Sequence, residues 1–438
     1  MSRYRLQPGG SVTGELRVPG DKSISHRALM LGGIAEGTSE VSGFLASEDC
    51  LATLAALEAL GVAIERPERE RVIVRGAGLE GLRAPSRPLD MGNAGTAMRL
   101  AMGLLAGRPF DATLVGDASL MRRPMERVAV PLRQMGARIA TEEGHPPVRI
   151  RGGGPLHAID YRLPVASAQV KSALLLAGLT ASGETRVTEP APTRDHTERM
   201  LAAFGVRVER RGATAALEGG QPLRATHIEV PADFSSAAFF LVAGCLAARD
   251  GITLKGVGIN PTRTGLLDML RAMGADIRVR TAAAGGPSAA IGEPSADIEV
   301  HASALRGIEV PLALVPLAID EFPVFFIAAA CADGETVVRG AEELRVKETD
   351  RLAAMAEGLG RLGIDHELLP DGLAIRGRGG FRAGTVDSHR DHRVAMAFAI
   401  ASLRAEGPVE VLDVANVATS FPGFIEIARS AGLAIEAD

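Results

Sequence analysis

The sequence predicts an α/β fold of two domains, each built from three repeated β-α-β-α-β-β units. Three observations predict this: an apolar-Gly-apolar step recurs six times, each step ends an apolar helical stretch, and alternating strand-like residues follow it. The six glycines are Gly61, Gly136, Gly205, Gly274, Gly363 and Gly432. A period of about 70 residues is long enough for a folded unit, so six copies predict the architecture.

Each unit is expected to begin with a short strand, followed by a polar turn into an alanine-rich apolar helix. These turns begin near residues 18, 89, 163, 230, 308 and 386. A second strand and a second helix follow, and the glycine of the step is the expected left-handed cap of that helix. Alternation such as Val72-Ile73-Val74 then predicts the closing hairpin.

The ends of the chain indicate how the units are divided. The last unit stops near residues 434–436 without a returning strand, whereas residues 14–18 form a spare strand. We therefore expect the N-terminal strand to complete the sixth unit, which gives one domain of residues 1–20 plus 231–438 and an inserted domain of residues 21–230. The two crossing strands would form a hinge, and the active site would lie in the cleft between the domains.

One interval between steps is longer than the others. The spacing before Gly363 is 89 residues rather than about 70, and residues 281–296 are rich in Gly, Ala and Pro. We expect this insertion to be a long exposed hairpin loop.

Composition excludes several classes of function. A formal charge of −5 and a pI near 6.1 argue against a protein that binds nucleic acid by bulk electrostatics. Cys50, Cys245 and Cys331 lack metal or redox spacing, which favours buried residues of a reduced, cytoplasmic protein. No signal peptide is visible, and the apolar stretches are shorter than the roughly 20 residues that span a bilayer. We expect a monomer without a membrane partner, a metal or a cofactor.

Cations gather at the predicted helix starts. The densest cluster, at residues 19–27, supplies a lysine, two hydroxyls, a histidine and an arginine. Arg and Lys also open several second helices, although a cation there opposes the helix dipole. Ordinary capping by Ser, Asp and Asn explains any single turn, but it does not explain these cations. An anionic ligand shared by several helix starts is therefore predicted.

Four motifs resemble the signatures of the 3-phosphoshikimate 1-carboxyvinyltransferase (EPSP synthase) family of enolpyruvyl transferases. They follow the family order along the whole chain, and together they are highly specific. They are Pro-Gly-Asp-Lys-Ser-Ile-Ser-His-Arg at 19–27, Gly-Asn-Ala-Gly-Thr-Ala-Met-Arg at 92–99, Arg-Val-Lys-Glu-Thr-Asp-Arg-Leu at 345–352 and Asp-His-Arg at 391–393. Further motifs at 167–171, 194–198 and 260–263 resemble those of a second, often glyphosate-tolerant subgroup.

The resemblance implies that the two α/β domains given above are inside-out α/β domains, and that the chain catalyses a reaction of the shikimate pathway to aromatic amino acids. The enolpyruvyl group of phosphoenolpyruvate would pass to the 5-hydroxyl of shikimate 3-phosphate with release of phosphate, without a cofactor. It places around shikimate 3-phosphate the residues Lys22, Ser23, Arg27, Ser167, Ala168, Gln169, Arg194, Asp320 and Lys347. It places around phosphoenolpyruvate the residues Lys22, Asn93, Gly95, Thr96, Arg123, Gln169, Arg351 and Arg393.

The resemblance also implies the catalytic roles. Asp320 would act as the base near the 5-hydroxyl, and Lys22 with Glu348 would move the proton to and from the methylene carbon. Which of Lys22 and Glu348 carries each proton stays open. His26, His196 and His392 are expected to be structural hydrogen bonders rather than bases.

Two positions depart from the family pattern. Thr419 stands where many relatives have a lysine before Ser/Thr-Phe-Pro. The contact to phosphate that this lysine would make is therefore expected to be absent. Gly95 stands where most of the second subgroup has alanine, which leaves the response to glyphosate open.

Two alternative functions fit the sequence less well. UDP-N-acetylglucosamine enolpyruvyl transferase uses Lys-Asn near its start and usually a loop cysteine, whereas this chain has Lys22-Ser23 and no cysteine from Asp117 to Arg123. A non-catalytic anion-binding scaffold would have no use for the acid-base set of Lys22, Asp320 and Glu348.

Overall fold

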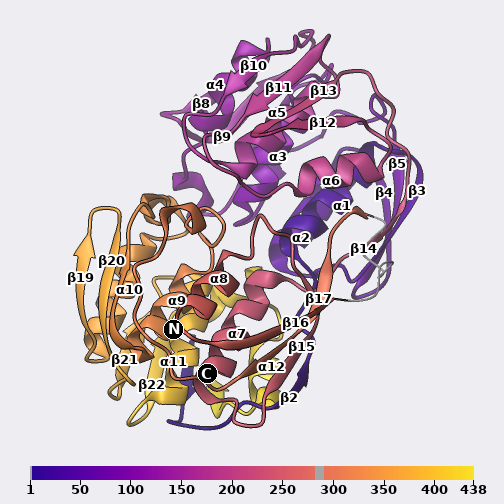
Figure 1. Cartoon of the computed structure of the whole chain (residues 1–438). Coiled ribbons are helices and arrows are strands. Elements are labelled where there is room, and N and C mark those ends of the chain that lie inside the picture. The colour runs from indigo at the N-terminus through magenta and orange to yellow at the C-terminus, as the bar shows by residue number, and fades with distance from the viewer. Residues whose placement is uncertain (1, 282–290) are drawn as a thin grey trace. The chain divides into compact units, whose positions relative to one another are not determined.

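The structure, a computed structural model, describes residues 2–281 and 291–438 and divides into two compact units (Figure 1). We call residues 20–231 together with 291–293 the inserted unit. We call residues 2–19, 232–281 and 294–438 the terminal unit, because it contains both ends of the chain.

The inserted unit contains three copies of the predicted repeat. Its elements are α1 (Lys22–Ile34), β3 (Glu36–Ser42), α2 (Glu48–Ala59), β4 (Ala63–Glu68), β5 (Arg71–Ala77), β6 (Leu89–Asp90), α3 (Gly95–Leu105), β7 (Ala112–Val115), η1 (Leu120–Arg122), α4 (Glu126–Gln134), β8 (Arg138–Glu142), β9 (His145–Arg151), β10 (Asp160–Arg162), α5 (Ala168–Gly178), β11 (Glu184–Thr188), α6 (His196–Ala203), β12 (Val208–Arg211), β13 (Thr214–Glu218) and β14 (His227–Glu229).

The terminal unit repeats the same order. Its elements are β1 (Arg3–Leu6), β2 (Gly14–Leu16), α7 (Phe234–Ala247), β15 (Ile252–Gly258), α8 (Gly265–Ala272), β16 (Asp276–Thr281), β17 (Ser295–His301), η3 (Leu312–Leu314), α9 (Phe322–Cys331), β18 (Asp333–Val338), η4 (Glu342–Val346), α10 (Arg351–Arg361), β19 (Asp365–Leu369), β20 (Gly372–Arg378), β21 (Gly384–Asp387), α11 (His392–Ala401), η5 (Ser402–Arg404), β22 (Val409–Leu412), η6 (Val414–Thr419), α12 (Phe424–Ala431) and β23 (Ile435–Ala437).

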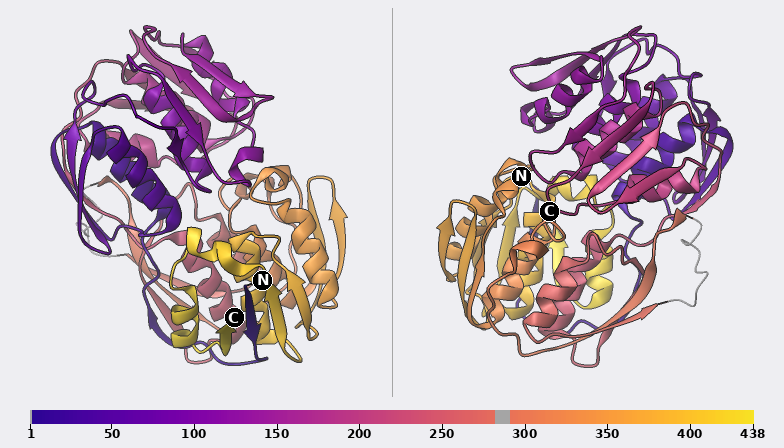
Figure 2. Two further views of the ribbon diagram at one scale, coloured as in Figure 1. Left: turned by 180° about the vertical axis from the view of Figure 1, so that it is seen from behind. Right: turned by 45° about the horizontal axis from the view of Figure 1, so that its top comes forward.

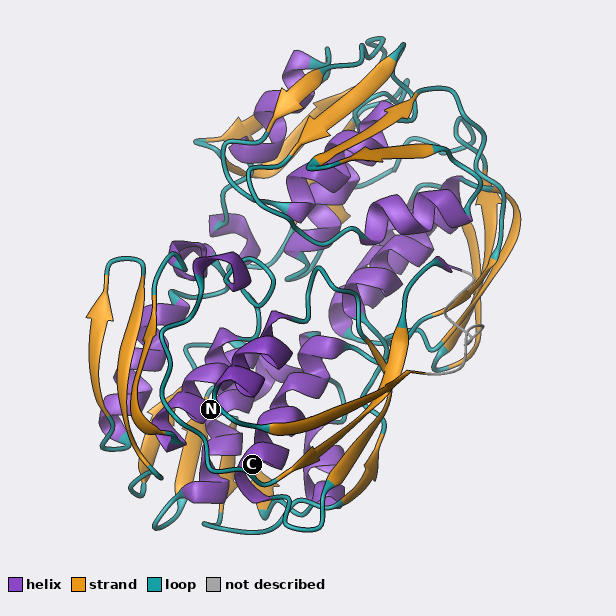
Figure 3. Cartoon of the chain, in the orientation of Figure 1, coloured by secondary structure: helices purple, strands orange, loops and turns teal. Residues whose placement is uncertain are grey.

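The strands of the described chain form six small mixed sheets, which confirms the predicted fold class (Figure 3). In five of these six sheets an edge strand runs parallel to its neighbour, and the hairpin strands are antiparallel, as in the order β6-β7-β9-β8. The sheet β18-β20-β19 has only isolated parallel bridges, from Arg306 and Glu309, at the corresponding edge. The six step glycines all have φ between 79° and 107°, the left-handed cap that the pattern predicts.

The apolar first helices of the terminal unit form its core. Every residue of α7 is buried, and α7, α9 and α11 pack on one another, with the sheets outside them (Figures 1 and 2). A helix that is apolar on all sides must be surrounded by protein, so the alanine-rich sequence of these helices accounts for the sheet-outside arrangement. No helix of the described residues is long and apolar enough to cross a bilayer.

The prediction for the N-terminal strand was wrong in one respect. β1, at Arg3–Leu6, completes the sixth sheet by pairing with β22 and β23. β2, which covers most of the predicted 14–18 strand, instead runs parallel to β15 in the sheet of the fourth repeat. Likewise β14 pairs with β3 of the first repeat. β2 therefore precedes α1 in the sequence but is an edge strand in the sheet of the fourth repeat. β14 precedes α7 but is an edge strand in the sheet of the first repeat.

The prediction of an exposed loop at 281–296 is also wrong for residues 291–293. β16 and β17 form the expected hairpin, with Thr281 opposite Ala296, and residues 282–290 lie outside the described chain. Ile291 and Glu293, however, are buried in the inserted unit, at 0% and 2% exposure. An apolar side chain and a paired carboxylate hold this segment in place, and neither was recognised in a Gly- and Pro-rich stretch.

Candidate active site

The first turn of α1 carries Lys22, Ser23 and Arg27. Asp21 caps the helix by accepting the backbone N–H of Ile24 at 2.9 Å, so ordinary capping is present at this turn. The Lys22 Nζ forms an ion pair of 2.8 Å with Asp49 Oδ2 from α2. This pairing holds the ammonium group at the helix start, with part of its side chain still exposed.

Arg27 is buried and held by two hydroxyls. Its Nε donates to Thr197 Oγ1 at 2.7 Å and its Nη2 to Ser172 Oγ at 2.9 Å. Burial lowers the pKa of Arg27 to about 10, although the carboxylates of Glu198 and Asp21 act in the opposite direction. The guanidinium group therefore remains charged at neutral pH.

Gln169 connects two helix starts in the same unit. Its Oε1 accepts from Arg99 Nη1 at 2.6 Å, and its Nε2 donates to Thr96 Oγ1 at 2.8 Å. Ser167 caps α5, and Ala168 is the first residue of that helix. The amide of Gln169 is thus fixed between α5 and the first turn of α3.

Arg123 lies against the turn that precedes α3. Its Nη2 donates to Asn93 Oδ1 at 2.6 Å and its Nη1 to the Asn93 carbonyl oxygen at 3.2 Å. A Cβ added to Gly95 would lie 2.9 Å from Arg123 Nη1, so glycine lets the guanidinium group come this close to the backbone. The side chain of Ala94 cannot cap α3, which leaves the start of that helix without a side-chain cap.

A second cluster lies in the terminal unit around Arg351. Arg351 is 1% exposed and bonds Asp391 Oδ2 through Nε at 2.8 Å and Glu348 Oε2 through Nη2 at 2.7 Å. Its Nη1 lies 3.4 Å from Asp320 Oδ1. Arg393 donates from Nη1 to the Asp320 carbonyl oxygen at 3.0 Å. Lys347 Nζ lies 3.9 Å from Asp320 Oδ1.

The charges of this cluster are strongly coupled. Burial lowers the pKa of Lys347, against the effect of the Asp320 carboxylate. Burial would also lower the pKa of Arg351, but the carboxylates of Asp391 and Glu348 outweigh it and hold that pKa above its ordinary value. Asp320 therefore lies close to three cations, the side chains of Lys347, Arg351 and Arg393.

The predicted residues are thus divided between the two units. The inserted unit holds Lys22, Ser23, Arg27, Asn93, Gly95, Thr96, Arg123, Ser167, Ala168, Gln169 and Arg194. The terminal unit holds Asp320, Lys347, Glu348, Arg351 and Arg393. Arg194 is half-buried in the turn that precedes α6, two residues before the helix starts at His196.

The three histidines make hydrogen bonds to side chains of their own unit. His26 Nδ1 lies 2.8 Å from Thr53 Oγ1, and burial lowers the pKa of His26 to about 3. His196 Nδ1 lies 2.7 Å from Glu293 Oε1, and His392 Nε2 lies 3.0 Å from Ser420 Oγ. His26 is therefore neutral at ordinary pH, and all three have the structural contacts expected of them.

Several supporting residues were missed from the sequence. Asp391 and Arg99 lie inside motifs that the sequence analysis quotes, so their spacing offered a signal. Asp49 and Thr197 offered none, because an acidic residue in the first turn of α2 and a threonine in the first turn of α6 are ordinary helix residues.

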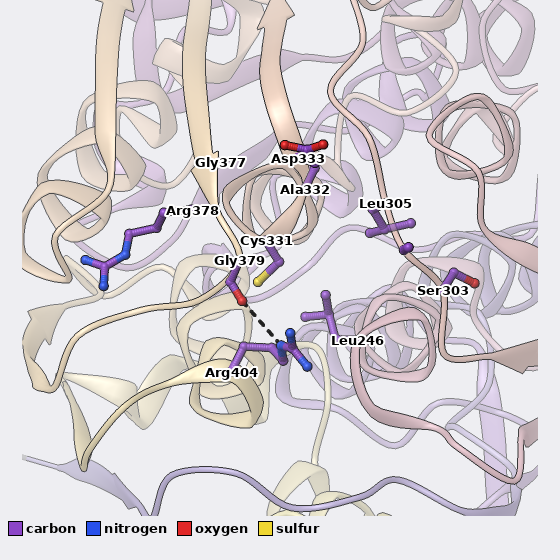
Figure 4. Close-up of a pocket in the computed structure, with 11 residues that line it drawn as sticks. Leu246, Ser303, Leu305, Cys331, Ala332, Asp333, Gly377, Arg378, Gly379 and Arg404 are labelled. Atoms are coloured by element: carbon purple, nitrogen blue, oxygen red, sulfur yellow. Dashed lines mark hydrogen bonds between the residues drawn. The ribbon is translucent and has the colours of Figure 1, made fainter.

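The cavity of about 450 Å³ in the terminal unit does not contain this cluster (Figure 4). Cys331 and Arg404 line it, with Gly379 accepting from Arg404 Nε at 3.4 Å. Cys331 ends α9, whereas Asp320 precedes the start of α9, so the cavity is at the other end of that helix. In the two described stretches no group of three or more His, Cys, Asp or Glu is arranged to hold a metal ion.

Nearly the whole chain is similar to known proteins. The family model described as EPSP synthase (3-phosphoshikimate 1-carboxyvinyltransferase) matches residues 6–427. The 3-phosphoshikimate 1-carboxyvinyltransferase of Methylococcus capsulatus is 61% identical over 434 residues, which cover 99% of this chain and 98% of the relative. The enzyme of that name from Alkalilimnicola ehrlichii is 60% identical over 433 residues, 99% of this chain and 96% of the relative.

Solved structures show the same fold. The structure of EPSP synthase from Acinetobacter baumannii has a TM-score of 0.88 at 52% identity, with both chains fully covered. An enolpyruvyl transferase from Streptomyces tendae has a TM-score of 0.81 at 18% identity, covering 100% of this chain and 99% of that chain, and it shares the fold alone.

Proposed function

The chain belongs to the EPSP synthase family, and on that premise we propose how its two side-chain clusters carry out the reaction. The enzyme is a 3-phosphoshikimate 1-carboxyvinyltransferase of the shikimate pathway. It transfers the enolpyruvyl group of phosphoenolpyruvate to the 5-hydroxyl of shikimate 3-phosphate. The predicted identity and activity are thereby confirmed, whereas the roles of individual residues remain proposals.

We propose that Ser23, Arg27, Ser167, Gln169 and Arg194 bind shikimate 3-phosphate from the inserted unit. The contacts of Arg27 support this role. Two hydroxyls fix the guanidinium group. Glu198, whose charge raises the pKa of Arg27, belongs to a buried cluster in which Lys171 pairs with Glu189 and Glu198, with both N···O distances 2.8 Å. A fixed, charged guanidinium group suits a phosphate, because it offers paired N–H donors in one plane.

We propose that Lys22, Asn93, Gly95, Thr96 and Arg123 bind phosphoenolpyruvate at the start of α3. The uncapped helix start supplies N–H donors and the positive end of the helix dipole. The absence of a side chain at Gly95 keeps Arg123 close to those donors. Lys22 adds a point charge whose position is set by Asp49.

In the terminal unit Asp320 is proposed as the base for the 5-hydroxyl. Its position is set by Arg351 and by Arg393, which donates to its backbone carbonyl. Three nearby cations make a carboxylate a weaker base, but two bound anionic substrates would offset their field. The basicity of Asp320 would therefore rise when the substrates bind, and the proton would be taken as the 5-hydroxyl attacks.

Glu348 and Lys22 are proposed to move the proton at the methylene carbon. Protonation of C3 of phosphoenolpyruvate makes C2 electrophilic, and the 5-hydroxyl oxygen adds to C2. The resulting tetrahedral intermediate loses phosphate and gives back the proton from C3. Arg351 and Arg393 would stabilise the negative charge of the phosphoenolpyruvate moiety during these steps. The two clusters are proposed to act on the same pair of substrates.

The observation that carries these assignments is the group of three cations around Asp320 in a chain of this family. Phosphate release from phosphoenolpyruvate tests the activity directly. We expect release with shikimate 3-phosphate and none with UDP-N-acetylglucosamine. Release only with the second acceptor, or with neither, would contradict the proposal.

A further inference from the structure

The segment 291–293 contacts the first turn of α6. Glu293 Oε1 lies 2.7 Å from His196 Nδ1, and both side chains are almost fully buried, at 2% and 1% exposure. Arg199 donates from Nη1 to the Gly292 carbonyl oxygen at 2.5 Å. Ile291 is buried in the core of the inserted unit, which anchors the segment beside the helix.

The same turn of α6 holds residues of the proposed shikimate 3-phosphate site. Thr197, next to His196, accepts the Nε–H of Arg27 and donates to Ser172 Oγ at 2.7 Å. Asp195 binds Arg199 at 2.8 Å, so Arg199 connects the start of the helix to Gly292. Arg194 directly precedes this turn.

From these contacts we propose that Glu293 is a positioning residue for shikimate 3-phosphate. It holds the imidazole of His196 and thereby the first turn of α6, which in turn orients Arg27 through Thr197 and places Arg194. The proposal rests on the proposed function of Arg27 and Arg194. Segment 291–293 thereby has a role in substrate binding that the sequence did not suggest.

The negative charge of Glu293 also raises the pKa of Arg27, but by less than other carboxylates do. Among the charges that influence the pKa of Arg27, Glu198 and Asp21 precede Glu293 in size. A glutamine at position 293 would keep an acceptor for the Nδ1–H of His196, whereas alanine would remove it.

The test compares three purified full-length proteins, the wild type, Glu293→Ala and Glu293→Gln. Titration calorimetry gives the Kd for shikimate 3-phosphate, and steady-state assays give kcat and both KM values. We expect Glu293→Ala to raise the Kd and KM for shikimate 3-phosphate about tenfold, with kcat and the KM for phosphoenolpyruvate changed less than about twofold. We expect Glu293→Gln to restore most of the affinity.

A matched control is available in the same hairpin. Glu299 on β17 pairs with His301 at 2.9 Å and with Arg280, all in the terminal unit, and none of its contacts with the described residues joins it to either cluster. Glu299→Ala should leave both substrate affinities unchanged. His196→Ala should raise the Kd for shikimate 3-phosphate as much as Glu293→Ala does. The double variant should have a Kd no higher than that of either single variant.

An unchanged Kd for shikimate 3-phosphate in Glu293→Ala, with normal thermal unfolding, would overturn the proposal. Equal losses for both substrates and in kcat would also overturn it, because they would indicate a general structural role. Failure of the proposed roles of Arg27 and Arg194 would look different, since Arg27→Lys and Arg194→Ala would then also bind shikimate 3-phosphate with the wild-type Kd.

Discussion

At the scale of single residues, the site depends on side chains that fix other side chains. Asp391 illustrates this, because its Oδ1 caps α11 by accepting the Arg393 N–H at 2.8 Å while its Oδ2 accepts from Arg351 Nε. One buried carboxylate therefore holds the guanidinium group of Arg351 and the backbone of Arg393, two of the three arginines proposed for phosphoenolpyruvate. Lys22 with Asp49 and Arg123 with Asn93 follow the same principle.

Asp320→Asn tests the proposed base. The amide has nearly the shape of the carboxylate but cannot accept the hydroxyl proton, so we expect kcat to fall by about 10²-fold or more. Binding of shikimate 3-phosphate should stay measurable by calorimetry. A kcat near that of the wild type would remove Asp320 from the mechanism.

Gly95→Ala tests the space at the start of α3. The new Cβ would lie 2.9 Å from Arg123 Nη1, so the guanidinium group must shift, although Asn93 restrains it. Glyphosate is longer than phosphoenolpyruvate and should lose more from this crowding, a discrimination by steric clash. We expect the wild type to be sensitive, and the variant to show an inhibition constant raised far more than the KM for phosphoenolpyruvate. Inhibition assays that find a resistant wild type, or a variant as sensitive as its parent, would contradict this.

At the scale of elements, the packing of α1 on α2 includes a buried neutral histidine. The pKa of His26 is about 3 in the folded protein, against an ordinary value of 6.5. The unfolded chain therefore binds a proton below pH 6.5 that the folded chain does not bind. The contribution of His26 to the free energy of unfolding is fully present above pH 6.5. As the pH drops from 6.5 towards 3, this contribution falls by about 1.4 kcal/mol per pH unit.

His26→Asn should remove this dependence, because asparagine can keep a hydrogen bond to Thr53 without titrating. Between pH 7 and pH 5 we expect the wild type to lose about 2 kcal/mol more of its free energy of unfolding than the variant loses. Urea unfolding of both proteins at the two pH values measures the difference. Equal losses would show that His26 does not contribute to the acid sensitivity.

The sheet of the sixth repeat gives a second prediction at this scale. β1 lies between β22 and β23, so both of its edges are paired. Arg5→Pro removes a backbone donor from the middle of that strand and should lower Tm by at least about 4 °C. Arg5→Ala, which removes only partly exposed ion pairs, is the control and should change Tm little. Equal Tm values for the two variants would indicate that β1 adds little stability.

Local patterns predicted the repeats well because each unit carries its own markers. The step glycines, the capping residues Asp21, Ser167, Asp233 and Asp391, and the apolar helices are all readable from short stretches. The partners of β1 and β2 were not readable, because strand pairing depends on residues far apart in the sequence. For the same reason the sequence analysis found Lys22 and Arg27 but missed Asp49 and Thr197, which contact them from other helices.

At the scale of the whole molecule, charge neutralisation comes from side chains. The predicted substrate-binding residues include three arginines and two lysines with buried or partly buried side chains in positions set by ion pairs or hydrogen bonds: Arg27, Arg123, Arg351, Lys22 and Lys347. These cations can stabilise anionic substrates without a metal ion. We expect EDTA to leave the rate of phosphate release unchanged, and a rate abolished by EDTA and restored by a divalent ion would contradict this.

The pairing of β1 has a consequence for synthesis on the ribosome. Arg3 of β1 is bonded to Glu410 of β22, a separation of 407 residues. At about 5 to 20 residues per second, the ribosome needs roughly 20 to 80 s to make the partner strand after the first has emerged. Residues 20–231, in contrast, form an almost continuous unit that can fold while the rest is made. The nascent chain therefore carries an unpaired β1 from early in its translation until β22 has been made, and the inserted unit can be folded only in the later part of this interval, in which holding chaperones would have a binding segment.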